Sequence, residues 1–270
     1  MVTDIHVTVW DDSGGSAQVA AVFVHGVISW GTDDRYGFGA QRPLADSYRL
    51  LMVDRRGHGA SPDIDRTDYE VDADDIVGLL TNVPGGAHLV GHSYGGVAAM
   101  LAAARRPDLV RSLTLIQPGA LRPAADHPVV AEALRRSRQA TAELPPDLSP
   151  EDYLRMSTEG LGLPMPEPTP ERLRATRAAM RERPCWDADV PLQPLADASW
   201  PTLIITGTWE DAPEAYRRYA GEPLLAAADF IADRIGAERL RVPGFYPHTE
   251  QPALINDALR DLWRRVDTAS

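Results

Sequence analysis

Short apolar runs rich in β-branched residues alternate with longer amphipathic stretches along most of the chain. Seven such runs are present, at Asp4–Trp10, Val19–Val24, Arg49–Val53, Ala87–Val90, Leu113–Ile116, Thr202–Thr206 and Arg239–Val242. The first run alternates polar and apolar residues, whereas the central runs are apolar, as in strands buried on both faces of a sheet. The pattern predicts an α/β fold, with a mostly parallel sheet and helices on both faces.

Helical periodicity fills most of the gaps between these runs. The predicted helices are Tyr69–Leu80, Tyr94–Arg105, Pro213–Ile235 and Glu250–Val266. The second helix consists mainly of small apolar residues, which suits a helix packed closely on a sheet. The third contains a glycine and a proline within Gly221–Pro223, and we expect it to break there.

The stretch Gln117–Trp200 interrupts this alternation because it contains no convincing strand. Three helices are predicted within it, at Val129–Leu144, Ser149–Glu159 and Pro170–Arg183. Proline-rich linkers join them, and strands precede and follow the whole stretch. We predict a core formed by residues 1–117 and 201–270 and a helical cap formed by residues 118–200. The alternative is that these helices belong to the core.

Composition and charge narrow the classes of partner. The 270 residues carry a formal net charge of −12 and include one cysteine, Cys185, which excludes an intramolecular disulfide. The negative charge disfavours binding to nucleic acid or to an anionic membrane. Met1–Trp10 lacks the pattern of a secretory signal, and no apolar run approaches the ~20 residues of a membrane span. We expect a cytoplasmic monomer or homodimer that binds a small-molecule substrate.

The sharpest chemical signal is the sequence GHSYG at residues 91–95, between the run Ala87–Val90 and the helix Tyr94–Arg105. A G-x-S-x-G motif presents its serine on a strained strand-to-helix turn, and the small flanking residues let the backbones approach. The start of the helix adds free N–H groups and the positive end of its dipole. In this context Ser93 is the predicted nucleophile.

Two further segments carry motifs of a known family. His25-Gly26 follows the run Val19–Val24, and residues 54–61 read DRRGHGAS. With GHSYG and the order of the elements, these motifs make nearly the whole chain similar to the α/β-hydrolase superfamily, in its serine-nucleophile branch. The resemblance implies an eight-stranded, mostly parallel sheet with a helical cap inserted after the sixth strand, where residues 118–200 fall.

The resemblance also implies an oxyanion hole. Acyl transfer places negative charge on the substrate oxygen, which two backbone N–H groups should stabilise. The predicted donors are the N–H groups of Tyr94, which follows the nucleophile, and of Val27, which follows His25-Gly26. We expect the His25 side chain to hold this loop.

The general base should be a histidine that follows Ser93, which leaves His127 and His248. His248 lies between the last predicted strand and the last helix, where the family has its base, and we favour it. The family often reads G-x-G-H-x-P-H-x-E-x-P there, whereas residues 244–252 read GFYPHTEQP. Aligned on the final EQP, the catalytic position falls on Phe245 and His248 matches the second, non-catalytic histidine.

The acid that orients the base is equally ambiguous. The family usually has G-x-x-D after the strand that corresponds to Thr202–Thr206, and this chain reads GTWED at residues 207–211. Glu210 fits the spacing best and Asp211 follows directly. Some relatives place the acid after the sixth strand, where this chain has the uncharged Gln117.

The remaining candidates concern the pocket. The predicted substrate-binding residues are His25, Trp30, Trp186, Trp209 and Phe245. No phosphate-loop, dinucleotide or zinc-protease motif is present, so neither a cofactor nor a metal is predicted.

The predicted function is a serine hydrolase that cleaves an ester, lactone or thioester of a small, mostly apolar molecule through an acyl-enzyme on Ser93. The alternative is a non-hydrolytic enzyme of the same fold, a lyase or cyclase with an incomplete triad, since the fold hosts several chemistries. The irregular histidine loop and the uncharged Gln117 favour this alternative. A protein that only binds a ligand is the third hypothesis.

Overall fold

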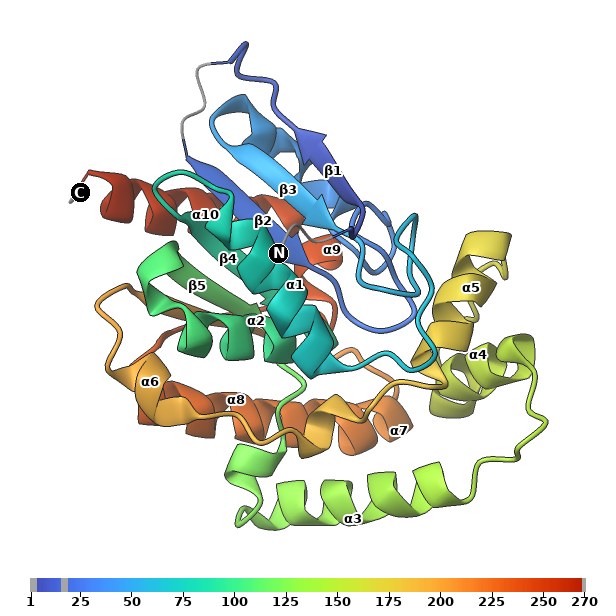
Figure 1. Cartoon of the computed structure of the whole chain (residues 1–270). Helices are drawn as coiled ribbons and strands as arrows, with labels where there is room; N and C mark the ends of the chain where they lie inside the picture. Colours follow the sequence, from blue (N-terminus) through green and yellow to red (C-terminus); the bar gives the residue numbers. More distant parts are fainter. Residues whose placement is uncertain (1–3, 16–18, 269–270) are drawn as a thin grey trace.

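A seven-stranded sheet forms the centre of the computed structural model, which describes residues 4–15 and 19–268 (Figure 1). The strands are β1 (Val7–Trp10), β2 (Ala20–Val24), β3 (Arg49–Val53), β4 (Ala87–His92), β5 (Val110–Ile116), β6 (Thr202–Gly207) and β7 (Glu238–Val242). Their order in the sheet is β1-β3-β2-β4-β5-β6-β7, and only the β1–β3 pair of these neighbours is antiparallel. Each of the seven predicted runs overlaps one of these strands.

Two expectations need correction or restriction. The described residues form seven strands, not the eight that the family resemblance implies. The prediction of eight came from the family and not from the chain, whose pattern contains seven strand-like runs. Residues 1–3 and 269–270, at the ends of the predicted core, lie outside the described residues, as does the beginning of Met1–Trp10.

The parallel strands end together at one edge of the sheet. The register pairs Val24 of β2 with Gly91 of β4, and pairs Ile116 of β5 with both His92 of β4 and Ile205 of β6. The loops that follow these strands therefore begin side by side. In open α/β sheets, ligands bind outside the carboxyl ends of the strands, so this edge should hold the site.

Helices cover both faces of the sheet, as predicted. One face carries α1 (Tyr69–Thr81), α2 (Tyr94–Arg105) and α8 (Glu222–Ile235), and the other carries η1 (Gly39–Asp46) and α10 (Pro252–Asp267). Figure 1 shows α1 and α2 in front of the sheet and α10 behind it. Val22 of β2 packs with the first set and the next residue, Phe23, with the second. This alternation is what a central strand buried on both faces requires.

Residues 118–200 contain helices and no strand. The helices are η3 (Arg122–Ala124), α3 (Pro128–Ala142), α4 (Pro150–Thr158), η4 (Glu159–Leu161), α5 (Pro170–Ala179), η5 (Cys185–Asp187) and α6 (Leu192–Ala196). The three predicted helices correspond to α3, α4 and α5. Helix α3 lies alongside α8, with Leu134 packed in a cluster that contains Ala227 (Figure 1). Leu195 of α6, in contrast, belongs to the core cluster of α2, so the segment is not wholly separate from the core.

The predicted break at Gly221–Pro223 takes the form of a wider helical turn. Helix α7 (Glu214–Tyr216) continues through a π-helical turn, η6 (Arg217–Gly221), into α8. A Cβ on Gly221 would lie 2.5 Å from the Trp209 ring, so glycine lets this turn approach the tryptophan. The remaining short helices are η2 (Pro107–Leu109), before β5, and α9 (Pro247–Glu250), before α10.

Candidate active site

Ser93 lies on the turn between β4 and α2, in a strained conformation with φ of 51° and ψ of −114°. Such a backbone costs a non-glycine residue about 1–3 kcal/mol and persists only where its surroundings hold it. The Ser93 N–H donates to the Ile116 carbonyl at 3.0 Å, and the Ser93 carbonyl accepts from the N–H groups of Gly96 and Gly119, each at 3.0 Å. The strained turn expected from GHSYG is confirmed, while the nucleophilic role of Ser93 stays a prediction.

The two glycines of the motif are required by close backbone approach. A Cβ on Gly91 would lie 2.6 Å from the Gly95 carbonyl oxygen, and a Cβ on Gly95 would collide with the Val24 carbonyl oxygen. Gly91 therefore lets β4 and α2 approach each other, and Gly95 lets α2 approach the end of β2.

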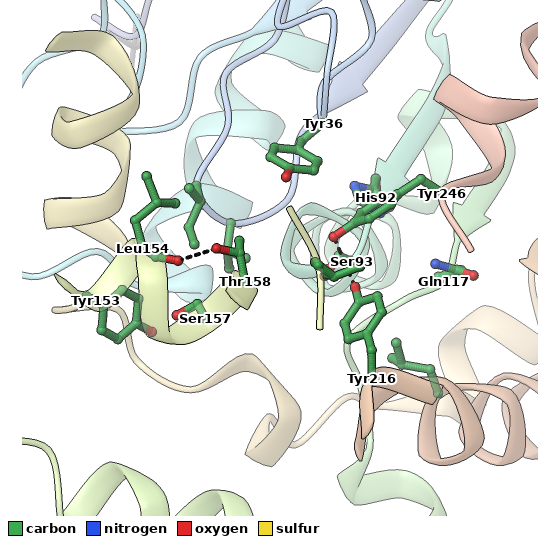
Figure 2. A pocket seen from close by; sticks show the side chains of 14 residues that line it. Tyr36, His92, Ser93, Gln117, Tyr153, Leu154, Ser157, Thr158, Tyr216 and Tyr246 are labelled. Atoms are coloured by element: carbon green, nitrogen blue, oxygen red, sulfur yellow. Dashed lines mark hydrogen bonds between the residues drawn. The ribbon is translucent and has the colours of Figure 1, made fainter. Parts of the chain in front are cut away.

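A pocket of about 250 Å³ opens at Ser93 (Figure 2). Its lining residues are Val27, Ile28, Tyr36, His92, Ser93, Gln117, Tyr153, Leu154, Ser157, Thr158, Leu163, Tyr216, Leu224 and Tyr246. Helix α4 supplies one wall, and the loops after β2, β6 and β7 supply the others. The lining is apolar with several hydroxyl groups, which suits a small, mostly apolar molecule that carries a few polar atoms.

A buried arginine, Arg55, fixes the loop that follows β2. Arg55, 1% exposed, donates to the carbonyls of His25 at 3.2 Å and Gly26 at 3.0 Å. Its guanidinium also pairs with Asp72 at 2.9 Å and with Glu182 at 2.7 Å. Burial raises the pKa of Asp72 to about 6, against the opposing charge of Arg55. This cluster ties the loop to α1 and to the segment after α5.

His25 is a structural residue of that loop. Its Nδ1 lies 2.8 Å from the Gly26 carbonyl, and its Nε2 accepts from the Arg55 N–H at 3.0 Å. Burial holds the pKa of His25 well below its usual value, so the ring is neutral. These contacts fit its expected role in holding the loop; His25 is not among the residues that line the pocket, and its part in substrate binding stays a prediction.

The two predicted oxyanion-hole residues flank Ser93. Val27 lines the pocket and is 40% exposed, whereas Tyr94 is the first residue of α2. N–H groups in the first turn of a helix have no partner within the helix, so the Tyr94 N–H is free to meet an anion. The oxyanion hole itself stays a prediction.

His248 is not in hydrogen-bond contact with Ser93. Its Nε2 lies 3.3 Å from the Tyr36 carbonyl oxygen, and its Nδ1 is buried without a partner among the described residues. The ring packs on His92 at 4.2 Å and on Phe38 at 5.2 Å between centroids. Burial lowers the pKa of His248 to about 4. His248 thus matches the second histidine of the family motif, and the loop does not swing it onto Ser93.

The predicted acids are not in the site either. Glu210 and Asp211 are exposed, and their carboxylates make no hydrogen bond or ion pair with any described residue. Trp209 adopts a φ of 61° and is 1% exposed, so it fills the interior while the two carboxylates face outward. The expected chain from an acid through His248 to Ser93 is therefore not assembled in this structure.

Gln117 occupies the centre of the rearranged loops. Its Oε1 accepts from the Gly207 N–H at 3.0 Å and from Trp209 Nε1 at 2.9 Å, and its Nε2 donates to the Phe245 carbonyl at 3.0 Å. An uncharged amide can satisfy two donors and one acceptor together, which a carboxylate cannot. Gln117 connects the ends of β5, β6 and β7.

Two tyrosines lie in the pocket beside Ser93. The hydroxyl oxygens of Tyr216, from α7, and Tyr246, from the loop before α9, are 3.0 Å apart. Burial raises the pKa of Tyr216 to about 12 and the pKa of Tyr246 well above its usual value. Both hydroxyls are protonated at neutral pH.

His92 is the one imidazole among the described pocket residues. Burial, together with the neighbouring His248 and His25, holds its pKa well below the usual value, so its ring is neutral. Its Nδ1 is buried without a partner among the described residues.

The predicted aromatic contacts lie outside the pocket lining. Trp30 packs under the Arg172 guanidinium at 4.6 Å, and Trp186 lines a neighbouring groove between α3 and α4. Phe245 borders a shallow surface groove, and Trp209 is buried behind Tyr216 at 5.0 Å between ring centroids. None of the four is among the residues that line the Ser93 pocket, and their part in substrate binding stays a prediction.

Sequence reasoning missed most of the pocket. The hydroxyl-bearing residues that it did not single out are Tyr36, Tyr153, Ser157, Thr158, Tyr216 and Tyr246. For Tyr246 a signal existed, because it directly follows Phe245 in the loop where the family histidine is missing. The others lie in segments where only the tertiary fold determines which face meets Ser93.

Residues 4–15 and 19–268 contain neither a candidate metal-binding cluster nor a candidate membrane-spanning helix. Within these ranges no group of three or more histidine, cysteine or acidic side chains could hold a metal ion. No helix there has both the length and the apolar character needed to cross a bilayer.

Similar proteins include a hydrolase and a lipase. A 2-(acetamidomethylene)succinate hydrolase of Mesorhizobium japonicum is 50% identical over 76 residues, which is 27% of each chain. An sn-1-specific diacylglycerol lipase of Mus musculus is 38% identical over 107 residues, 38% of this chain and 34% of the lipase. This chain thus spans only about a quarter to a third of these curated relatives.

The fold similarity extends over almost the whole chain. A thermophilic esterase of Thermogutta terrifontis superimposes with a TM-score of 0.60 at 25% identity, over 97% of this chain and 93% of the esterase. A model of the alpha/beta hydrolase family matches residues 21–258, which include Ser93, the strands β3 to β7 and all of β2 except its first residue. The chain belongs to the alpha/beta hydrolase family.

Proposed function

We propose that this protein binds the carbonyl group of a small, mostly apolar molecule at Ser93 and activates it by hydrogen bonding, for a non-hydrolytic reaction of the lyase or cyclase class. One observation carries the proposal. Neither nitrogen of His248 contacts Ser93 or a carboxylate, so the serine lacks the base that hydrolysis through an acyl-enzyme needs.

The hydrogen-bond donors around Ser93 support carbonyl activation. The Ser93 hydroxyl and the N–H groups of Val27 and Tyr94 are donors that could converge on one oxygen. The pocket offers about 250 Å³ for the rest of the molecule, with residues such as Leu154, Leu163 and Leu224 in its lining. We further propose that residues 118–200 act as a cap, because α4 forms one wall of this pocket.

The second candidate is hydrolysis of an ester, lactone or thioester through an acyl-enzyme on Ser93. The strained elbow at φ 51° favours it, because this geometry exposes a serine oxygen for attack. The esterase and lipase among the similar proteins also favour it. This reaction would require His248 to leave the Tyr36 carbonyl and Glu210 or Asp211 to turn inward.

A fluorophosphonate probe separates the two candidates. It labels a serine that a base activates, so we expect the wild type to label no faster than Ser93→Ala. A panel of nitrophenyl esters should likewise give the same slow hydrolysis with both proteins. If Ser93 is an activated nucleophile, the wild type will label rapidly, and Ser93→Ala will lower ester turnover by ~10³ or more. That outcome would replace the first candidate with the second.

A further inference from the structure

The loops that supply the acid and the base elsewhere in the family bring two tyrosines to this pocket. Tyr216 follows β6 and Tyr246 follows β7, and their hydroxyl oxygens are 3.0 Å apart. Both side chains line the same pocket as Ser93. Figure 2 shows them pointing toward one another at the Ser93 end of the pocket.

Tyr246 is held in place by the turn that contains it. A carboxylate oxygen of Glu250 accepts hydrogen bonds from the N–H groups of Phe245 at 2.7 Å and Tyr246 at 3.0 Å. Gly244 has a φ of 94°, and a Cβ there would collide with the same carboxylate. The Tyr246 ring also packs on Tyr36, with 5.2 Å between centroids. The turn therefore fixes the direction of the Tyr246 side chain.

The Tyr216 ring is held by aromatic residues of the rearranged loops after β6 and β7. Its ring packs on Trp209 at 5.0 Å and on Phe245 at 5.7 Å between centroids. Trp209 is fixed in turn by hydrogen bonds from its N–H to the Gly244 carbonyl at 3.0 Å and from Nε1 to Gln117 at 2.9 Å. Trp209, which is buried while Glu210 and Asp211 face outward, thus also positions Tyr216.

A pair of phenols supplies a hydrogen-bond donor. One hydroxyl donates to the other, and the second keeps its own proton available for a ligand. Because burial raises the pKa of both groups, to about 12 for Tyr216, neither ionises at neutral pH. The pair is therefore a donor rather than a base.

We propose that the Tyr216–Tyr246 hydroxyl pair donates a hydrogen bond to the carbonyl oxygen of the substrate beside Ser93, as catalytic residues of the proposed reaction. This inference rests on the proposed function, since it needs a carbonyl group in the pocket. The pair would polarise the carbonyl together with the backbone donors.

The test uses acetophenone labelled with ¹³C at the carbonyl carbon, bound at saturation and observed by NMR. A hydrogen bond to the oxygen draws electrons from the carbonyl carbon. The ¹³C resonance of this carbon should therefore lie downfield of its position in water when acetophenone is bound to the wild type. We expect the displacement to be roughly halved in Tyr216→Phe and in Tyr246→Phe, because the backbone donors remain. Tyr219→Phe is the matched control: Tyr219 lies on η6, is 49% exposed, and lies outside the Ser93 pocket.

Two further measurements keep the result interpretable. The displacement should stay constant between about pH 6 and pH 9, because both hydroxyls remain protonated. Replacement of Tyr246 by 3-fluorotyrosine, a stronger acid of nearly the same shape, should increase the displacement even if a phenylalanine variant folds poorly.

The outcomes separate this inference from the proposed function. If the wild type leaves the carbonyl resonance at its position in water, carbonyl activation fails, and the role of the tyrosines fails with it. If the wild type displaces the resonance and both phenylalanine variants match Tyr219→Phe, the tyrosine pair is not a donor to the substrate. The proposed function would then stand on Ser93 and the backbone groups.

Discussion

At the scale of single residues, the environment of His248 decides how the site can work. Its imidazole is buried against Phe38 and His92, with Nε2 on the Tyr36 carbonyl, and its pKa is lowered to about 4. A buried neutral histidine must take up a proton when the chain unfolds in acid. The His248 imidazole therefore makes the free energy of unfolding depend on pH.

The pH dependence gives a direct test of this environment. The folded pKa of His248 lies below the unfolded value of 6.5, so its contribution to stability is present above pH 6.5 and is lost as the pH falls toward 4. Between pH 7 and pH 5 the loss should be about 2 kcal/mol. We expect His248→Leu to reduce the fall in the free energy of unfolding over this interval by that amount, measured by urea denaturation. If the free energy of unfolding falls equally in the wild type and in His248→Leu between pH 7 and pH 5, the His248 imidazole is in contact with water in the folded protein.

Ser93 was predictable because the information is local. The glycines, the preceding strand and the following helix all lie within a few residues of it, and the structure reproduces that turn. The base and the acid were not predictable in the same way. Their positions depend on how the loops after β6 and β7 pack on each other, and Trp209 fills the interior there while the next two residues face outward.

At the scale of elements, α5 is joined to the loop after β2 by a buried ion pair. The Arg172 guanidinium donates to both oxygens of Asp33, at 2.7 and 2.8 Å, and also to the Ile28 carbonyl. Ile28 lines the pocket, so this joint positions a wall of the site from a helix of the predicted cap.

Removal of the Arg172–Asp33 ion pair should lower the free energy of unfolding. Arg172→Met leaves Asp33 buried without its ion-pair partner, and we expect a loss of about 3–5 kcal/mol in the free energy of unfolding. The double variant Arg172→Met, Asp33→Leu should recover part of the loss, because no charge is left unpaired. Arg155→Met, which removes exposed ion pairs on α4, is the control and should cost less than about 1 kcal/mol. Equal losses for the two single arginine variants would contradict a buried joint.

The hydrogen bonds by which Gln117 connects the ends of β5, β6 and β7 give a second prediction at the scale of elements. Gln117→Leu removes the partner of the Gly207 N–H, of Trp209 Nε1 and of the Phe245 carbonyl. Each buried group left unpaired costs about 1–3 kcal/mol, so the total loss should exceed that of a single hydrogen bond. Gln117→Glu keeps the acceptor and loses the donor, and it should lie between the wild type and Gln117→Leu in urea denaturation. If Gln117→Leu is as stable as the wild type, the amide does not connect these loops.

The elements themselves follow from the pattern of the sequence more fully than the site does. Each predicted strand is a run of apolar or alternating residues, and period-two burial in the sheet requires that pattern. Only the expectation of an eighth strand failed, because it came from the family. At the third predicted helix, Gly221 packs against Trp209 and the chain continues through a π-helical turn, a contact that spacing alone cannot reveal.

At the scale of the whole molecule, the segment 118–200 joins the core unevenly. Leu195 of α6 is buried in the same cluster as the sheet and α2. Helix α3 buries Val130, Ala133 and Leu134 in a small separate cluster, beside α8. The end of the predicted cap at α6 is therefore part of the core, whereas α3, near its beginning, is attached by few side chains.

Hydrogen exchange measured by mass spectrometry should resolve this difference. Amide groups of α3 should exchange through local opening, well before those of β4 and β5, because little apolar surface holds the helix. Those of α6 should be better protected than α3, since α6 cannot leave without exposing Leu195. Leu195→Ala should then lower the global stability by about 2–5 kcal/mol, as for other buried leucines, whereas the exposed Met156→Ala should change it little. Uniform exchange from residue 118 to residue 200 would instead mean that the segment opens as one independent unit.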